Sequence, residues 1–369
     1  TDRDHPTGEL TVRIPCGQAM HVELWDMASG QRFRADRLAG FENGILSIHT
    51  SLDAAGTSAF VLTQTADQTL PLLPAAEKTL TEITVTGDVP YRLSEKNVCV
   101  LDFARWKWAD GTWSDEIEIL KADQAVRDSI GIEHRGGSML QPWFSKLHDR
   151  KIYGQLEVEF TFDIETMPES DLILAGERPE NLHYRLNGHD LAVPDCHDFW
   201  IDDCFKCMQL PRTLLKVGRN TVSYTVDFMR TTNLEALYLI GDFGVCLDGH
   251  RRTLTTLPER IGNLNLESYR LPFYTGEVTY LFSPETYAHL DLSGAGHVYL
   301  SPTAFTGALV KVAAEGEDGE QLLLWDPYEA DVTDAVRAKQ TIAVTVVGTR
   351  HNVFGPLHLV PAIQGAYGP

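Results

Sequence analysis

The sequence predicts an all-β protein built from antiparallel β-sandwich domains, and three observations carry that prediction. Apolar and polar residues alternate along several segments, as they do in strands with one buried face and one solvated face. Turn-forming pairs such as Asn187-Gly188 and Asp248-Gly249 separate these segments. Repeating strand–helix–strand units are absent from the sequence, which argues against a Rossmann domain or a TIM barrel within this chain.

The alternation is clearest in residues 156–163 and 221–228, and it recurs in residues 278–282 and 342–346. In these segments every second residue is apolar, so we expect each one to be a strand with one face in a hydrophobic core. The apolar positions are Leu156, Val158, Phe160, Phe162, Val222, Tyr224, Val226, Phe228, Val278, Tyr280, Phe282, Ile342, Val344 and Val346.

One helix is predicted, over residues 115–130. Ser114 is placed to cap its first turn, and acidic residues at 115 and 116 suit the positive end of the helix dipole. Gly131 is placed to end it, because glycine readily adopts the left-handed conformation of a helix C-terminus. A short helical turn is also expected at residues 333–336.

The chain divides into three predicted domains. Residues 1–88 are expected to form a small β-sandwich domain, residues 89–260 a jelly-roll domain with the helix, and residues 261–369 a second jelly-roll domain. Residues 68–77, with two prolines, are the best linker candidate. Short strands are predicted in the first domain at residues 10–14, 20–24, 45–48 and 59–62.

Charge and composition exclude some partners. The 369 residues include 52 acidic and 31 basic side chains, for a net charge of −21. This excess repels phosphate backbones and anionic membranes, so neither nucleic acid nor a lipid surface is an expected partner.

No apolar run in the sequence is long enough to span a bilayer. The sequence opens at Thr1 without an initiating Met, so we expect that either a leader has been removed or the chain is a piece of a longer protein.

The second and third predicted domains share an order of motifs. In the second domain an Asn-Gly turn, a tryptophan loop and a Leu-Lys-Val-Gly-Arg-Asn turn precede the strand at 221–228. In the third domain a tryptophan loop and an Asp-Val-Thr-Asp turn precede the strand at 341–347. The segments are Leu186-Asn187-Gly188, Trp200-Ile201-Asp202, Leu215-Lys216-Val217-Gly218-Arg219-Asn220, Trp325-Asp326-Pro327-Tyr328 and Asp331-Val332-Thr333-Asp334.

These motifs resemble the galactose-binding-like jelly rolls of glycoside hydrolases, found in the β-galactosidase and β-glucuronidase family and in large bacterial α-L-rhamnosidase-like enzymes. Three further segments, at residues 174–180, 271–276 and 350–358, resemble the α-L-rhamnosidase-like group. The resemblance covers roughly residues 90–360. The last domain departs from it, because its Asn-Gly and Gly-x-Asn turns are replaced. The segments are Leu174-Ala175-Gly176-Glu177-Arg178-Pro179-Glu180, Leu271-Pro272-Phe273-Tyr274-Thr275-Gly276 and Arg350-His351-Asn352-Val353-Phe354-Gly355-Pro356-Leu357-His358.

The resemblance implies the C-terminal accessory region of a glycoside hydrolase. In that family the hydrolytic carboxylates belong to a (β/α)₈ barrel that precedes these domains, so the barrel of the same parent protein and a carbohydrate are the implied partners. No catalytic residue is assigned to this chain, and the sequence carries no G-x-S-x-G, H-E-x-x-H or P-loop motif. Two alternatives stay open: a free-standing carbohydrate-binding protein without catalytic activity, and a purely structural sandwich protein.

Trp200 and Trp325 are the predicted sugar-contact residues, because the apolar C–H face of a pyranose ring stacks on an aromatic ring. Neighbouring acids and a tyrosine would bind the hydroxyl groups. The alternative is that each tryptophan plugs the end of its own core, since tryptophan is usually largely buried. The predicted substrate-binding residues are Trp200, Asp202, Asp203, Trp325, Asp326 and Tyr328.

A second aromatic group precedes the helix and consists of Trp106, Trp108 and Trp113. Alternation places Trp106 and Trp108 on one face of a strand. They would form a sugar platform or a hydrophobic seam against another domain, and we favour the seam.

Two groups of residues in the sequence have the chemistry to bind a metal ion. Cys196-His197 with Cys204-x-x-Cys207 offers zinc ligands, but the two cysteines of the pair would point to opposite faces of a strand. We therefore favour buried thiols, with a disulfide from Cys196 as the alternative in an exported protein, and assign no metal ligand. A structural calcium is common in galactose-binding-like domains, and suitable loop acids are Asp163, Asp195, Asp198 and Asp331. His358 is interpreted as a capped loop residue.

Overall fold

The alternating segments form strands, and the computed structural model is mostly β, with 46% of the described residues in strands and 12% in helices. The predicted class of antiparallel β-sheet protein is confirmed at this level. The structure describes residues 5–27, 30–52, 56–73, 87–134, 151–192, 198–262, 265–290, 296–302, 305–316, 319–325 and 328–354. Two compact units are present: unit 1 comprises Thr1–Val85, Tyr287–Phe305 and Leu309–Ile342, and unit 2 comprises Thr86–Thr286, Thr306–Ala308 and Ala343–Pro369.

Unit 2 contains two large sheets. The first has eight strands in the order β10-β9-β11-β17-β13-β14, with β20 beside β11 and β19 beside β20. These strands are β9 (Phe103–Trp108), β10 (Ile117–Glu118), β11 (Ile152–Ile164), β13 (His183–Leu186), β14 (His189–Asp190), β17 (Gly218–Met229), β19 (Gly244–Asp248) and β20 (Arg251–Thr255). Pairing is antiparallel except for a two-residue parallel contact between β11 and β20.

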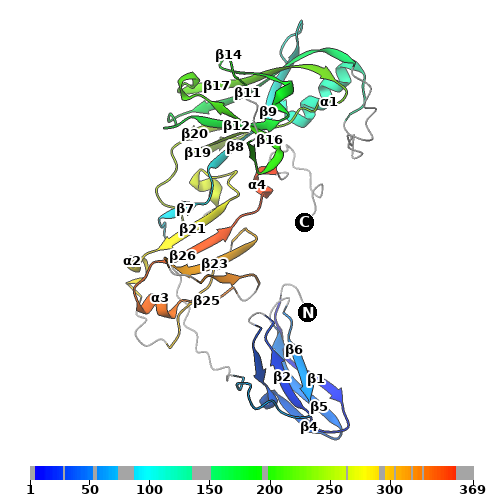
Figure 1. The fold of residues 1–369 in the computed structure, drawn as a ribbon, viewed down its shortest axis with the longest axis vertical. Coiled ribbons are helices and arrows are strands. Elements are labelled where there is room, and N and C mark those ends of the chain that lie inside the picture. The colour runs from blue at the N-terminus through cyan, green and yellow to red at the C-terminus, as the bar shows by residue number, and fades with distance from the viewer. Residues whose placement is uncertain are drawn as a thin grey trace. The chain divides into compact units, whose positions relative to one another are not determined.

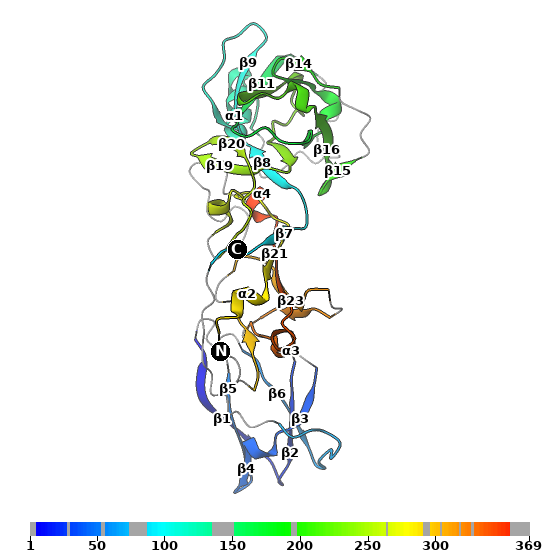
Figure 2. The same ribbon diagram turned by 90° about the vertical axis from the view of Figure 1, so that its left-hand side faces the viewer.

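The second sheet of unit 2 has five strands in the order β15-β16-β12-β18-β8. They are β8 (Asn97–Leu101), β12 (Leu172–Glu177), β15 (Phe199–Trp200), β16 (Asp202–Leu210) and β18 (Leu237–Gly241). Figures 1 and 2 show the two sheets as separate layers in both views. A pair of strands outside these sheets, β7 (Tyr91–Leu93) and β21 (Glu277–Phe282), also belongs to unit 2.

One hydrophobic core fills the space between the two sheets of unit 2. The alternating residues of β11 and β17 lie on its inner side, as predicted, and are at most 5% exposed. Leu174, Met208 and Leu239 contribute from the five-stranded sheet. On the opposite face of β11, Glu157 and Glu159 are half-buried rather than exposed, because Lys107 and Arg105 of the neighbouring strand form ion pairs with them.

Helix α1 (Ile119–Ile130) begins later than the sequence predicts. Glu118 caps it by accepting hydrogen bonds from the backbone N–H groups of Leu120 and Lys121, so the prediction that Ser114 caps a helix from residue 115 is wrong. Residues 117 and 118 instead pair with β9 as strand β10. The predicted end at Gly131 is confirmed, with φ of 68° in the left-handed region.

The N-terminal part of unit 1 consists of two three-stranded sheets, in the orders β1-β5-β4 and β3-β2-β6. Figure 2 shows them as two layers, and a small core of Val22, Ala35, Leu46 and Ile48 belongs to both. The four predicted strands of this region are confirmed. The elements are β1 (Thr7–Pro15), β2 (His21–Trp25), β3 (Arg32–Arg34), β4 (Ala39–Glu42), β5 (Ile45–Leu52) and β6 (Ala59–Thr63).

The later part of unit 1 holds short strands and the predicted helical turn, which is helix α3 (Thr333–Arg337). Strand β22 (Tyr299–Leu300) pairs with β25 (Ala330–Asp331), and β23 (Leu309–Ala314) pairs with β24 (Gln321–Leu323). Helix α2 (Pro284–Tyr287) and strand β26 (Ile342–Val347) lie where the chain passes between units, and helix α4 (His351–Phe354) belongs to unit 2. The division into domains at 1–88, 89–260 and 261–369 stays a prediction. Within the described residues, no helix has the length and apolar character needed to cross a membrane.

Candidate functional site

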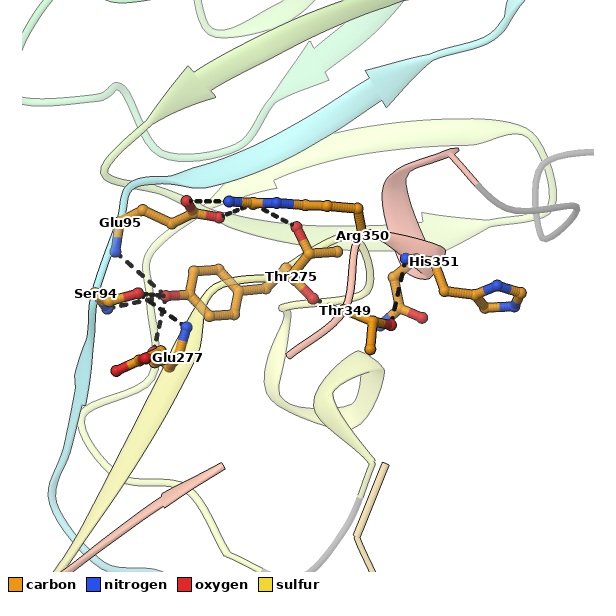
Figure 3. Close-up of polar contacts among 9 residues, drawn as sticks. Ser94, Glu95, Thr275, Glu277, Thr349, Arg350 and His351 are labelled. Carbon is orange, nitrogen blue, oxygen red and sulfur yellow. Dashed lines mark hydrogen bonds and ion pairs between the residues drawn. The ribbon is translucent and has the colours of Figure 1, made fainter. Parts of the chain in front are cut away.

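Two of the segments that resemble glycoside hydrolases meet at Arg350. Its guanidinium forms a bidentate ion pair with Glu95, with Nη2 at 3.0 Å from Oε2, and its Nη1 donates to the Thr275 hydroxyl at 2.9 Å. Figure 3 shows Arg350, Glu95 and Thr275 in this arrangement. The Tyr274 hydroxyl accepts from the Ser94 N–H and donates to the Glu277 carbonyl, both at 3.0 Å. The segments at 271–276 and 350–354 are therefore fastened to the turn before β8.

Close backbone contact at this junction requires glycine. A Cβ at Gly348 would lie 2.5 Å from the Thr275 carbonyl oxygen, and a Cβ at Gly276 would lie 2.5 Å from the Tyr274 hydroxyl. Neither position has room for a side chain, because contacts this short are strongly repulsive. The Thr-Gly ending of the 271–276 segment thus has a structural explanation.

The third segment, residues 174–177 in β12, pairs with the two strands whose aromatic residues surround Trp200. Strand β12 pairs with β16 and β18, which places Glu177 opposite Phe205 and Ala175 opposite Tyr238. The Trp200 cluster consists of four rings: Trp200, Phe205, Tyr238 and Phe354. Trp200 lies 6.2 Å from Phe205, 5.0 Å from Tyr238 and 6.0 Å from Phe354, measured between ring centroids. All three segments of the resemblance therefore contribute to one region of unit 2.

Trp200 belongs to a strained hairpin tip. Ile201, between β15 and β16, has φ of 66°, a left-handed conformation that a β-branched residue rarely adopts. Phe199 is 55% exposed and Ile201 37% exposed, while Trp200 is half-buried. Phe199 and Ile201 at the tip thus expose aromatic and aliphatic surface to solvent. The Trp200 ring packs against Phe205, Tyr238 and Phe354.

The predicted acids Asp202 and Asp203 follow Trp200 on the same hairpin, and both are exposed. Asp202 Oδ1 accepts from the Cys204 backbone N–H at 2.9 Å, and hydrogen bonds from the Cys204 N–H and thiol lower the pKa of Asp202. Asp203 forms an ion pair with Lys206 at 2.5 Å. Both side chains carry carboxylate oxygens beside Trp200 that can accept hydrogen bonds from hydroxyl groups.

The second predicted loop lies in unit 1 and follows β24. Trp325 is 51% exposed, whereas Tyr328 is half-buried and packs edge-on against Phe305 at 5.1 Å. Asp326 lies outside the described residues. The six predicted sugar-contact residues are therefore divided between two units, with Trp200, Asp202 and Asp203 on one hairpin.

Trp106 and Trp108 are half-buried on the core of their own unit, and the expected seam against another domain stays a prediction. They do share one face of β9, as predicted, but both rings pack against the core of their own unit. Trp108 donates to the Ser129 hydroxyl of α1 at 3.1 Å and meets Phe228 edge-on at 5.8 Å. Trp113 lies on the other face, over the cationic groups of Arg105 and Lys107.

The described residues offer no group of three or more His, Cys, Asp or Glu side chains that could hold a metal ion. Cys204 is exposed and Cys207 is half-buried against the core, and neither forms a disulfide bond; the same holds for Cys16, Cys99 and Cys246. Although the Cys204 residue is exposed, local desolvation and a hydrogen bond to Asp202 raise the pKa of its thiol to about 12, which disfavours the thiolate that zinc requires. Cys196 and His197 lie outside the described residues.

Of the four predicted calcium donors, two bind other protein groups, one is exposed and one lies outside the described residues. Asp163 is buried at the end of β11 and accepts from Arg251 at 2.7 Å. Asp331 accepts from the Thr333 N–H at 2.9 Å and contacts His297 at 3.0 Å. Asp198 is exposed, and Asp195 and His358 are not among the described residues.

A polar hollow, which the sequence does not predict, lies on the outer face of the eight-stranded sheet. Its volume is about 630 Å³, and strands β11, β13, β14 and β17 supply most of its lining. The residues that line it are Gln155, Leu182, His183, Tyr184, Arg185, Asp190, Leu191 and Thr225. No local motif marks these positions, because they come together only through the pairing of strands distant in sequence.

Comparison with known proteins gives weak and distant likenesses. No protein-family model matches the sequence, and no curated protein matches it. Among solved structures, the rhamnosidase from Novosphingobium sp. PP1Y is 14% identical, with a TM-score of 0.20 over 62% of this chain and 18% of that chain. The α-L-rhamnosidase from Streptomyces avermitilis, complexed with L-rhamnose, is 11% identical, with a TM-score of 0.23 over 93% of this chain and 34% of that chain. The α-L-rhamnosidase from Aspergillus terreus is 11% identical, with a TM-score of 0.14 over 71% of this chain and 44% of that chain. The chain spans less than half the length of each of these enzymes.

Proposed function

We propose that this chain is an accessory region of an α-L-rhamnosidase-like glycoside hydrolase, whose galactose-binding-like jelly rolls bind carbohydrate and brace a catalytic barrel of the same parent protein. The observation that carries the proposal is the exposure of aromatic rings at both predicted loops. Trp325 is 51% exposed, and the half-buried Trp200 shares a hairpin tip with Phe199, which is 55% exposed. A protein with purely structural sandwiches would bury both tryptophans, whereas exposed aromatic surface marks a binding site.

The surroundings of Trp200 support carbohydrate as the ligand class. The ring is fixed by Phe205, Tyr238 and Phe354, so it loses little conformational entropy when a sugar stacks on it. Asp202, which pairs with Trp200 across the hairpin, and Asp203 are exposed acceptors on the same hairpin. An apolar platform beside hydrogen-bond acceptors matches a pyranose, which has an apolar face and a rim of hydroxyl groups.

Removing the half-buried Trp200 ring and the exposed Trp325 ring tests the carbohydrate part of the proposal. We expect W325A and W200A each to weaken binding of the preferred sugar about tenfold at its own loop, which corresponds to about 1.4 kcal/mol. Isothermal titration calorimetry with L-rhamnose, D-galactose and their oligosaccharides measures the affinity. W25A removes a tryptophan that is 42% exposed in the N-terminal sandwich and serves as the matched control. W200F keeps an aromatic ring in the cluster and controls for a folding defect in W200A. Wild-type affinity in both W200A and W325A would contradict the proposal.

The accessory part of the proposal predicts how activity is distributed. The native gene product is expected to be longer than this chain and to hydrolyse aryl α-L-rhamnosides, whereas this chain alone is expected to be inactive. Intact-mass measurement and hydrolysis assays on both proteins make the comparison. Activity in this chain alone would place the catalytic carboxylates here and overturn the accessory role. An inactive native product no longer than this chain would favour a free-standing carbohydrate-binding protein.

A further inference from the structure

We propose that the outer face of the eight-stranded sheet of unit 2 is a further carbohydrate site, which takes an oligosaccharide rather than a monosaccharide. This inference rests on the proposed function, since it extends sugar binding from the tryptophan loops to the sheet. Its starting point is the hollow of about 630 Å³ on this face, a volume within the usual range for ligand sites.

Strand pairing arranges the side chains of this face in two rows. Both rows lie on the side of the sheet opposite the core, because they alternate with the buried residues of β11 and β17. One row joins Lys107, Glu157, Thr225 and His183 across β9, β11, β17 and β13. The other row joins Arg105, Glu159, Ser223 and Arg185 across the same strands. The result is a continuous strip of polar groups that ends in the hollow.

The charges of the strip are balanced. Lys107 pairs with Glu157 at 3.0 Å, Arg105 with Glu159 at 2.5 Å, and Arg185 with Asp190 at 2.8 Å. Because every ion pair contributes one positive and one negative group, the strip attracts neither a polyanion nor a polycation. A neutral polar ligand is the class that fits this pattern.

The hollow offers donors and acceptors side by side. Arg185 uses Nε in its bond to Asp190, so its terminal guanidinium nitrogens carry further N–H donors. The Asp190 side chain is 83% exposed and accepts hydrogen bonds, while the exposed His183 and Gln155 and the half-buried Thr225 can serve in either role. Sugar hydroxyls both donate and accept, so this mixture suits a neutral saccharide.

The strip also has apolar surface near both of its ends. Leu182 and Leu191 line the hollow at one end. At the other end the half-buried Trp113 lies on the same face, next to β9. Its ring is 4.5 Å from the Arg105 guanidinium carbon and 4.7 Å from Lys107 Nζ. From β9 to β13 the strip crosses three strand spacings, about 14 Å. A ligand that contacts both Trp113 and Arg185 must therefore contain several linked sugar rings.

The test compares R185M and W113A with the wild-type chain by isothermal titration calorimetry, using rhamnose and galactose monosaccharides and their tri- and tetrasaccharides. We expect R185M to weaken oligosaccharide binding about tenfold and to leave monosaccharide affinity unchanged. W113A should act in the same direction. K96M, which removes a cation of the exposed Lys96–Asp242 pair outside the strip, is the control and should leave both affinities unchanged.

A second set of variants distinguishes binding at the sheet from binding at the two tryptophan loops. In the W200A/W325A double variant, oligosaccharide binding should persist in part and be lost when R185M is added. If the double variant binds no sugar while R185M and W113A bind oligosaccharides like wild type, the sheet site is refuted and the proposed function stands. If the wild-type chain binds none of these sugars, the proposed function fails and the sheet site fails with it.

Discussion

Replacing Arg127 by methionine is expected to lower the free energy of unfolding of unit 2 by about 3–5 kcal/mol. The Arg127 side chain is 1% exposed and pairs with the Asp123 carboxylate, which is 3% exposed, at 2.7 Å within helix α1. Arg127 also donates to the carbonyls of Arg230 and Thr232, so it joins the helix to the loop that follows β17. Methionine fills part of the space but provides no N–H donor for the Asp123 carboxylate or for the carbonyls of Arg230 and Thr232.

Urea unfolding followed by tryptophan fluorescence measures this effect, because Trp108 contacts the Phe228 ring that lies beneath Arg127. The control is R185M, which breaks an ion pair whose side chains are 46% and 83% exposed and should cost at most about 1 kcal/mol. The double variant D123L/R127M should recover part of the loss, because it removes the stranded charge. A loss below about 1 kcal/mol for R127M would show that the buried pair does not hold the helix in place.

The second large effect concerns the pH dependence of stability and comes from Asp102. This residue is 3% exposed and accepts from Arg252 Nη2 at 2.9 Å. Burial raises the pKa of Asp102 to about 6 from an ordinary value of 3.8, and the nearby Arg252 charge offsets only part of that rise. The folded state therefore holds a proton that the unfolded state has released between about pH 4 and pH 6.

A raised pKa in the folded state means that stability from this group is fully present below about pH 4 and is lost as the pH rises through about 6. The shift corresponds to about 3 kcal/mol. We expect the difference in unfolding free energy between wild type and D102N to fall by that amount over this interval, on top of a constant offset from the changed contact with Arg252. D242N, which removes the exposed acid of the Lys96–Asp242 pair, controls for the loss of one negative charge. A difference that rises with pH would mean that Arg252 outweighs desolvation.

The strands could be predicted from the sequence because the alternation of buried and exposed residues lies within each strand. The inner residues of β11 and β17 alternate with a period of two, and all of them face the core. The end of helix α1 at Gly131 was predictable for a similar reason, since a left-handed C-terminus favours glycine. The start was not, because residues 117 and 118 pair with Phe103 and Ala104 in a contact that no helical pattern reveals.

The candidate sites depend on contacts between distant residues. Trp200 and Trp325 could be identified from their own residue type, but whether each ring is exposed depends on neighbours such as Phe354, from a separate helix. Arg350 and Glu95 are 255 residues apart in sequence, so their pairing follows from the fold alone. The strip on the eight-stranded sheet depends on the register of four strands, which alternation within one strand does not determine.

Protection of tryptophan fluorescence by sugar tests the central claim, that the exposed rings of this chain bind carbohydrate. The whole chain would be quenched with acrylamide at increasing concentrations of rhamnose and galactose oligosaccharides. We expect saturable protection of a solvent-accessible tryptophan population by at least one of these sugars, and loss in W200A/W325A of all protection except the part that an oligosaccharide bound at Trp113 provides. Quenching that does not change with any of them, at concentrations up to the millimolar range, would contradict it.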